Sequence, residues 1–163
     1  MSTEKFIATL KDNQNLIYKV CYTYCYNTDL RKDLEQEILF QLWRSFPNFD
    51  GRVKVSTWMY RIALNTAISF LRTDKKFENQ KLSFDESIIT FPTNEYEVEQ
   101  DENIALLYEF INKLNELDKA LILLYLDNFK YKEIAAVLGI SESNVATKMQ
   151  RIKNKLKTQF KTF

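Results

Sequence analysis

Residues 129–156, FKYKEIAAVLGISESNVATKMQRIKNKL, constrain the fold of this chain more than any other stretch. Apolar residues recur at the i, i+3, i+4 and i+7 spacing of an amphipathic helix, first before Gly139 and again after it. The residues expected to face inward are Tyr131, Ile134, Ala135 and Leu138 in the first helix and Val145, Met149, Ile152 and Leu156 in the second. Two such helices joined by a short turn predict a helix-turn-helix.

The turn between these helices has suitable residues for its geometry. Gly139, one of only two glycines in the chain, follows the first helix, where the left-handed C-terminal position favours a residue without a Cβ. Ile140 then fills the turn. Ser141 stands where an N-cap hydroxyl satisfies unpaired N–H groups of the second helix. The order apolar, glycine, apolar, polar therefore supports the helix-turn-helix prediction.

The outward face of the second helix predicts contact with DNA. Residues 142–163 hold six Lys or Arg against one acidic residue. A helical hairpin with a merely solvated basic face is the alternative, but the short polar residues at the helix start favour entry into a major groove. The predicted contact residues are Ser143, Asn144, Thr147, Lys148, Gln150, Arg151 and Lys155. Lys153 and Lys157 are expected over the DNA backbone.

Composition predicts an all-α protein with no histidine-based chemistry. The 163 residues include two glycines, two prolines and no histidine, so His nucleophile triads, His bases and His metal ligands are excluded. Cys21 and Cys25 lie one helical turn apart and are expected to be small hydrophobic-core residues, with redox sensing or metal binding as the alternative. We expect no cofactor, no metal and no catalytic activity. No apolar run reaches the length of a membrane span and no signal peptide opens the chain, which predicts a cytoplasmic protein.

The charge distribution predicts two domains and a linker. Net charge is only +1, but residues 75–103 carry 3 basic and 8 acidic side chains, whereas residues 104–163 carry 10 and 6. The acidic stretch also lacks a sustained helical period and contains Pro92, so it is typical of a flexible linker. We therefore expect two small helical domains, 1–74 and 103–163, joined by an acidic linker over 75–102.

The first domain is expected to contain helices over 5–27, interrupted near Asn13 and Asn15, and over 29–46. In the second of these, Asp33 and Glu37 are spaced i, i+4 on the polar face. That face is either an ordinary solvated surface or an acidic docking ridge. After the polar loop RVKVS, a further helix is expected to start at a cap formed by Ser56 or Thr57.

Aromatic and basic residues interleave between positions 46 and 72. Trp58, Ile62 and Ala63 are expected to face inward. The rest allow two interpretations, a cluster of buried aromatics or a surface on which unpaired bases stack while cations hold phosphates. In the second domain, Ile104, Leu107, Tyr108, Ile111 and Leu114 predict an amphipathic helix from Asn103. Asp118 is the expected cap of KALILLYL, which is apolar nearly all round and predicted to be central.

Taken together, these segments resemble the extracytoplasmic-function branch of bacterial RNA polymerase sigma factors. The likeness rests on DLEQEILFQLWRSFPNF and STWMYRIALNTAISFLR in the first half and YKEIAAVLGISESNVATKMQRIKNKL in the second. It implies a region 2-like domain, a linker that threads the RNA exit path of the polymerase, and a region 4-like domain. The implied function is to bind core polymerase, recognise promoter DNA, open the −10 element and support transcription initiation.

The resemblance also implies partners and site residues. It implies docking on the β′ clamp helices and the β flap, an anti-sigma factor, and a monomer when unbound. The residues matching the β′ docking surface are Asp33, Gln36, Glu37, Leu42 and Trp43. Those matching the −10 region are Phe49, Arg52, Lys54, Trp58, Tyr60, Arg61, Ile62 and Asn65, with Tyr60, Ile62 and Asn65 at positions that line a pocket for a flipped base. The helix-turn-helix would read the −35 element.

Two other classes of function remain as alternatives. One is a stand-alone helix-turn-helix regulator with an N-terminal sensor or dimerisation domain, which would bind duplex DNA unaided. The other is a nucleic-acid-processing enzyme, which the absence of histidine and of a P-loop disfavours. Ala146 departs from the resemblance, because the family often has Lys or Arg there. This departure predicts that Lys148 and Arg151 carry a larger share of the −35 contacts.

Overall fold

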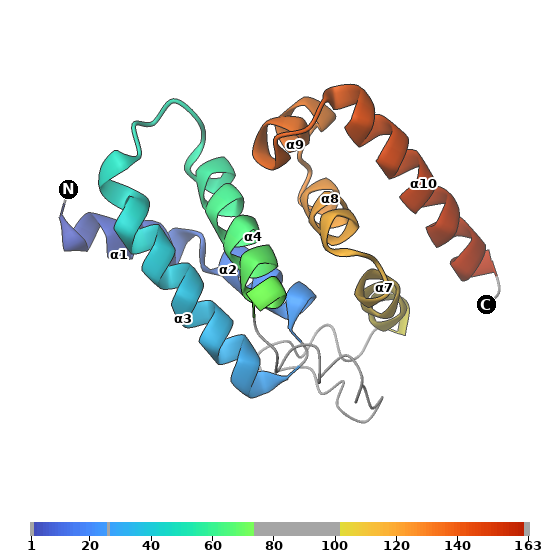
Figure 1. Cartoon of the computed structure of the whole chain (residues 1–163), viewed down its shortest axis with the longest axis horizontal. Helices are drawn as coiled ribbons and strands as arrows, with labels where there is room; N and C mark the ends of the chain where they lie inside the picture. The colour runs from blue at the N-terminus through green and yellow to red at the C-terminus, as the bar shows by residue number, and fades with distance from the viewer. Residues whose placement is uncertain (1, 26, 74–101, 162–163) are drawn as a thin grey trace. The chain divides into compact units, whose positions relative to one another are not determined.

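The computed structural model describes residues 2–25, 27–73 and 102–161 (Figure 1). All regular structure in these ranges is helical, which confirms the all-α prediction. The chain divides into two compact units, Met1–Ser83 and Phe84–Phe163. The predicted linker, apart from Glu102, lies outside the described residues. None of the described helices is long and apolar enough to cross a membrane.

Within residues 2–25 and 27–73, the N-terminal unit has five helical segments. These are α1 (Thr3–Asp12), α2 (Gln14–Tyr24), α3 (Thr28–Ser45), the 3-10 turn η1 (Phe46–Asn48) and α4 (Val55–Thr73). The predicted break between the first two helices falls at Asn13, whose backbone N–H donates to the Leu10 carbonyl. Asn27 caps α3, because its side-chain oxygen accepts from the N–H groups of Asp29 and Leu30.

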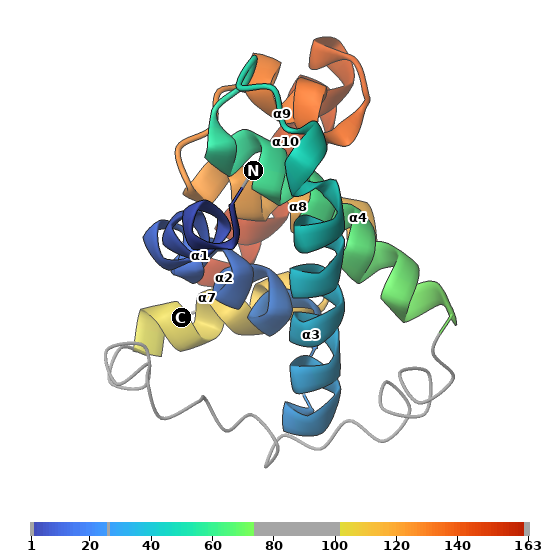
Figure 2. The same cartoon turned by 90° about the vertical axis from the view of Figure 1, so that its left-hand side faces the viewer.

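The hydrophobic core of this unit lies where α2, α3 and α4 meet (Figure 2). Apolar residues at helical spacing on α3 and α4 point into it and are fully buried: Leu34, Ile38, Leu42, Met59, Ala63 and Ala67. Burying one leucine side chain stabilises a fold by about 1.5–3 kcal/mol. The packing of these buried residues of α3 and α4 therefore stabilises the N-terminal unit. Ala63 is therefore inward as predicted, whereas Trp58 and Ile62 are only half-buried.

Both cysteines belong to this core, as predicted. Cys21 lies on α2, Cys25 ends that helix, and both are buried. Burial, assisted by the nearby charges of Glu35 and Cys25, raises the pKa of the Cys21 thiol to about 12. A thiolate is therefore strongly disfavoured at this position, and the thiolate is the form that reacts and binds metals. No group of three or more potential metal ligands occurs within the described ranges.

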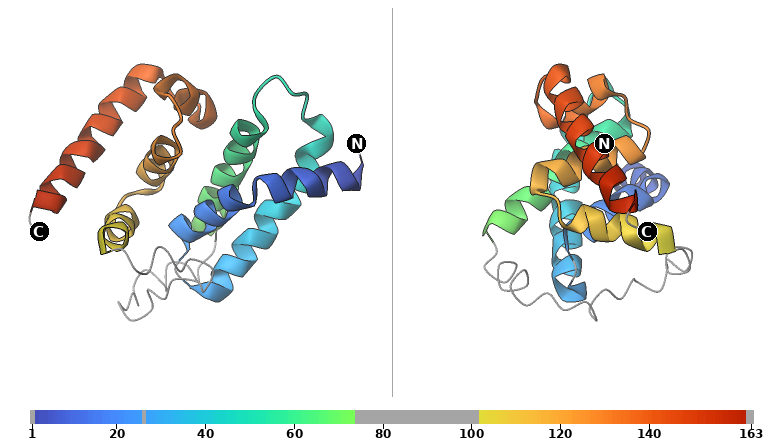
Figure 3. Two further views of the ribbon diagram at one scale, coloured as in Figure 1. Left: turned by 180° about the vertical axis from the view of Figure 1, so that it is seen from behind. Right: turned by 90° about the vertical axis from the view of Figure 1, so that its right-hand side faces the viewer.

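Within residues 102–161, the C-terminal unit contains α7 (Glu102–Asn112), α8 (Glu116–Leu126), α9 (Tyr131–Leu138) and α10 (Glu142–Lys161). Helix α8 packs against the other three (Figure 3). Its buried residues include Ala120, Leu121, Ile122, Leu123 and Leu124, which confirms the central position predicted for KALILLYL.

Three local predictions need correction. Asn115, not Asp118, caps α8, since its side chain accepts the Asp118 N–H at 2.8 Å and Asp118 is already within the helix. Helix α4 begins at Val55, before the predicted caps, and Thr57 is buried within it. On α7, the predicted stripe is mostly half-buried, and Phe110 joins Ile111 in the core. These errors arise because several polar residues compete for each cap, and because tertiary packing decides which side of a helix is covered.

Candidate nucleic-acid and polymerase interfaces

The helix-turn-helix turn has the predicted geometry. Gly139 adopts the left-handed conformation, with φ of 70°, and its N–H donates to the Ala135 carbonyl. Ile140 donates to the same carbonyl at 3.2 Å. The Ser141 hydroxyl accepts the Asn144 N–H at 3.1 Å, which confirms Ser141 as the cap of α10. The turn therefore fixes where α10 begins and which of its faces points away from α9.

Helix α10 has one buried and one exposed side. Val145, Met149 and Ile152 are buried, as predicted, and Leu156 is half-buried. Most predicted DNA-contact residues are exposed on the other side: Ser143, Asn144, Thr147, Gln150, Arg151 and Lys155. Lys148 is half-buried. On α9 the buried residues are Ile134 and Val137, while Tyr131, Ala135 and Leu138 are half-buried.

Lys153 does not have the surroundings expected of a DNA-backbone contact. Its ammonium donates to the Tyr131 hydroxyl at 3.1 Å and lies 4.5 Å from the centre of the Tyr125 ring. The structure therefore holds the ammonium against two tyrosines, and the position of Lys153 over the DNA backbone stays a prediction. Helical spacing could not reveal this contact, which joins residues 22 positions apart.

The residues matched to the −10 region lie on α4 and the preceding loop. Phe49 packs against Trp58 with ring centres 4.9 Å apart, and Trp58 also contacts Phe46. The other candidates differ in exposure: Arg52, Lys54 and Asn65 are exposed, whereas Arg61 and Ile62 are half-buried. Arg52 pairs with Asp50 at 3.1 Å. The aromatic residues thus form a half-open cluster, with cations at its edge.

Tyr60 needs a correction. It was placed in a base-capture pocket by resemblance, but its side chain is wholly buried among the helices of the N-terminal unit. A side chain with no exposed surface cannot stack on a base, so in this structure Tyr60 supports the position of α4 instead. Asn65, five residues further on, is exposed.

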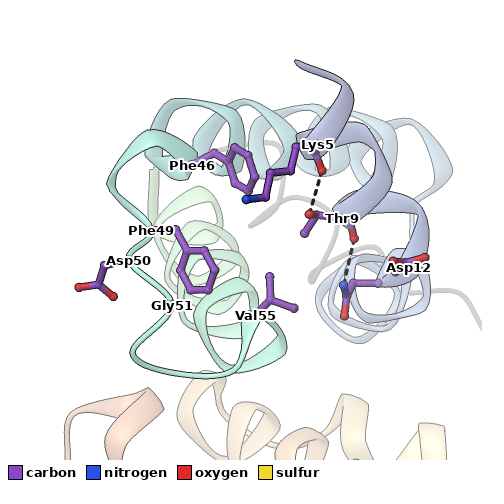
Figure 4. Close-up of a pocket in the computed structure, with 9 residues that line it drawn as sticks. Lys5, Thr9, Asp12, Phe46, Phe49, Asp50, Gly51 and Val55 are labelled. Carbon is purple, nitrogen blue, oxygen red and sulfur yellow. Dashed lines mark hydrogen bonds between the residues drawn. The ribbon is translucent and has the colours of Figure 1, made fainter. Parts of the chain in front are cut away.

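A hollow of about 320 Å³ lies between α1 and the loop that leads into α4 (Figure 4). Phe46, Phe49 and Val55 give it apolar walls, and α1 adds polar ones. The α1 residues that line it are Lys5, Thr9 and Asp12, and Asn13 lines it from the break before α2. None of these four was a predicted site residue. Lys5, Thr9 and Asp12 are spaced i, i+4 and i+7, which indicates one face of a helix. Only the tertiary structure brings that face to the loop.

The residues matched to the polymerase docking surface lie on α3. Asp33, Gln36 and Glu37 are exposed, and Trp43 is 46% exposed. Leu42 is wholly buried, so its assignment as a docking contact is corrected: it anchors α3 in the hydrophobic core. Sequence reasoning missed Phe40, which is 54% exposed. An apolar residue three positions after Glu37 on a polar helix face was the available indication.

Five of the exposed residues of α3 follow the i, i+3, i+4, i+7 and i+10 spacing of one helix side, defined here as the α3 face: Asp33, Gln36, Glu37, Phe40 and Trp43. Helical geometry places Phe40 close to both Gln36 and Glu37 on this face. Trp43 is held by an edge-on contact with Phe6, with ring centres 5.1 Å apart. The α3 face thus presents two exposed aromatic residues, a residue type enriched at protein interfaces, beside the carboxylates of Asp33 and Glu37.

Comparisons with known proteins agree with this architecture. Residues 9–77 match sigma-70 region 2, and residues 104–156 match sigma-70 region 4. RNA polymerase sigma factor SigZ of Bacillus subtilis (strain 168) is 33% identical over 128 residues, covering 77% of this chain and 69% of SigZ. ECF RNA polymerase sigma factor SigW of the same organism is 26% identical over 155 residues, covering 89% and 83%. The sigma factor RpoE from Bartonella quintana, solved in complex with the anti-sigma factor NepR, has the same fold, with TM-score 0.69, 19% identity and coverage of 97% and 95%.

Two helical units, the second with a helix-turn-helix, define a two-domain transcription protein. The chain belongs to the extracytoplasmic-function branch of the sigma-70 family, and its function is that of an RNA polymerase sigma factor. A stand-alone regulator with an unrelated sensor domain is not favoured, because the N-terminal unit matches region 2 over most of its length.

Proposed function

We propose that the two units divide promoter recognition between duplex and unpaired DNA, while the α3 face binds the β′ clamp helices of core polymerase. The observation that carries this proposal is the contrast between the two exposed surfaces. One is a polar and basic helix face on a helix-turn-helix, and the other is a half-open aromatic cluster beside a hollow. Duplex readout suits the first and base stacking suits the second.

The duplex contacts belong to α10, which enters the major groove of the −35 element. Its buried stripe leaves Asn144, Thr147 and Arg151 exposed on the opposite side. Side chains near the start of a recognition helix reach base edges, whereas those further along reach phosphates. Arg151 is therefore assigned to a base edge and Lys155 to a phosphate. The N-terminal cap by Ser141 supports this division, because it keeps the first turn of α10 ordered.

The contacts with unpaired DNA bases are made by the loop before α4. The hollow between that loop and α1 receives an unstacked base of the −10 element, with Phe49 available for stacking. Lys5 on one side and Lys54 on the other supply positive charge for the flanking phosphates. Stacking of one base on an aromatic ring is worth about 1–3 kcal/mol, enough to offset much of the cost of unstacking.

The partners follow from the same assignment. The α3 face docks on the β′ clamp helices and the C-terminal unit on the β flap. The protein acts in the cytoplasm, without catalytic chemistry of its own. It is a monomer when unbound, and an anti-sigma factor inhibits it, as NepR binds the similarly folded RpoE.

A reconstitution experiment tests this function. The purified chain is mixed with sigma-free core polymerase, and transcription is measured from promoter fragments selected from random DNA by the holoenzyme. Initiation at sites with two conserved elements, and only in the presence of both proteins, supports the proposal. Sequence-specific binding of duplex DNA by the chain alone, as a dimer, supports a stand-alone regulator instead.

A further inference from the structure

Three helices of the C-terminal unit are joined at one point by Lys153 of α10. Its Nζ lies 4.5 Å from the ring centre of Tyr125, near the end of α8, and 5.6 Å from that of Tyr131, the first residue of α9. Nζ also donates to the Tyr131 hydroxyl at 3.1 Å, and the two rings are 6.5 Å apart. We call these three residues the Lys153 clasp.

The chemistry of the Lys153 clasp favours the position of its ammonium against the two tyrosines. A cation within about 6 Å of an aromatic centre is attracted to the ring face, and both tyrosines meet that condition. Hydrogen bonding to Tyr131, and to a smaller extent to Tyr125, raises the pKa of Lys153 above its ordinary value, so the amine stays protonated. Moving to a phosphate would require Lys153 to give up all of these contacts.

The Lys153 clasp also provides a directional contact, which the buried stripe of α10 does not. Val145, Met149 and Ile152 hold α10 through apolar contacts, and the hydrophobic effect is non-directional. The hydrogen bond between Lys153 and Tyr131 is directional. It ties α10 to the start of α9, the helix that precedes the turn. The contact with Tyr125 ties it to α8, the central helix of the unit.

We propose that Lys153 is a positioning residue that sets the tilt of α10 for −35 recognition and makes no DNA contact itself. This inference rests on the proposed role of α10. Asn144 lies nine residues from Lys153, or about 14 Å along the helix. A tilt of about 10° at the clasp would move it by about 2.4 Å, whereas hydrogen-bond lengths vary by only about 0.5 Å.

The test compares promoter binding by holoenzymes that carry Lys153→Met, Lys153→Arg, Tyr131→Phe or the control Lys155→Met. Affinity is measured at salt concentrations between about 50 and 200 mM. Lys153→Met should weaken binding about fivefold to tenfold at every salt concentration, with an unchanged salt slope. Lys155→Met should lower the slope by about 0.9, the value for one lost phosphate contact. Lys153→Arg should restore binding, because a guanidinium also donates and stacks on aromatic rings.

Tyr131→Phe removes only the hydroxyl and should reproduce part of the Lys153→Met defect. Combining the two changes should add little to Lys153→Met alone, because they break the same contact. NMR of the full chain provides a second readout. The Lys153 Cε protons should be shifted upfield by the tyrosine rings, and Tyr125→Leu should remove much of that shift. Circular dichroism establishes that each variant is folded.

Three results would overturn the inference while leaving the proposed role of α10 in place. A salt slope lowered by about 0.9 in Lys153→Met would identify a phosphate contact. Wild-type binding by both Lys153→Met and Tyr131→Phe would show that the clasp positions nothing, and so would the absence of an upfield shift. A wild-type holoenzyme without any −35 preference would instead refute the proposed role of α10, and this inference with it.

Discussion

Replacing Phe40 with alanine should weaken binding to core polymerase without weakening the fold. An aromatic side chain has about 150–250 Å² of surface, and Phe40 is 54% exposed, so about 80–140 Å² is available to a partner. At about 25 cal/mol per Å², full burial contributes at most about 2–3.5 kcal/mol. Since alanine keeps part of that area, we expect a loss of about 2–3 kcal/mol, or roughly 30-fold to 150-fold in Kd.

The assay is titration of fluorescently labelled chain with core polymerase in the absence of promoter DNA. Val53→Ala is the matched control, because Val53 is also an exposed apolar residue of the N-terminal unit, at 39%, but lies outside the α3 face. Leu42→Ala is the contrasting variant. Leu42 is wholly buried, so its truncation should cost about 2–5 kcal/mol of stability. Unchanged affinity in Phe40→Ala, with Val53→Ala also unchanged, would refute the assignment of the α3 face.

The remaining predictions concern the DNA-binding residues and the buried thiol. Arg151→Ala should cost about 1–3 kcal/mol and relax preference at one −35 position, whereas Lys155→Ala should weaken all promoter variants alike; binding across single-base variants distinguishes the two. Phe49→Ala should slow promoter opening more than it weakens the closed complex, as measured by permanganate footprinting; normal opening would count against the hollow. Folding raises the pKa of Cys21 from 9.0 to about 12. The contribution of the protonated Cys21 thiol to the free energy of unfolding should therefore be complete below pH 9 and decrease as the pH rises towards 12. At pH 8 its labelling by a thiol reagent should therefore follow unfolding, and rapid labelling of the native protein would contradict this.

Periodicity and turn chemistry were enough to predict the helix-turn-helix from sequence. The spacing of Val145, Met149 and Ile152 identified the buried side of α10, and Gly139 and Ser141 fixed its turn and cap. These features are local, since they depend on residues within a few positions of each other. For the same reason the exposed side of α10 was assigned correctly for most of its candidates.

Features that depend on tertiary contacts could not be predicted from the sequence. Leu42 and Tyr60 were assigned to surfaces by resemblance, but packing of α3 and α4 buries both. Phe40 was missed because the residues one turn before it on the same face, Gln36 and Glu37, are polar. Lys5 was missed because only the folded chain brings α1 beside the loop before α4. Lys153 illustrates the same limit, because its tyrosine partners lie on two other helices.

The central claim is that this chain confers promoter specificity on core polymerase through two separate DNA elements. The most direct measurement is run-off transcription by the reconstituted holoenzyme on a selected promoter, with the −35 element, the −10 element or the spacer between them altered in turn. We predict that changing either element abolishes specific transcripts. The Arg151→Ala holoenzyme should become less sensitive to changes at one −35 position and should remain as sensitive as the wild type to −10 changes. Initiation that ignores both elements, or that occurs equally well with core polymerase alone, would contradict the account.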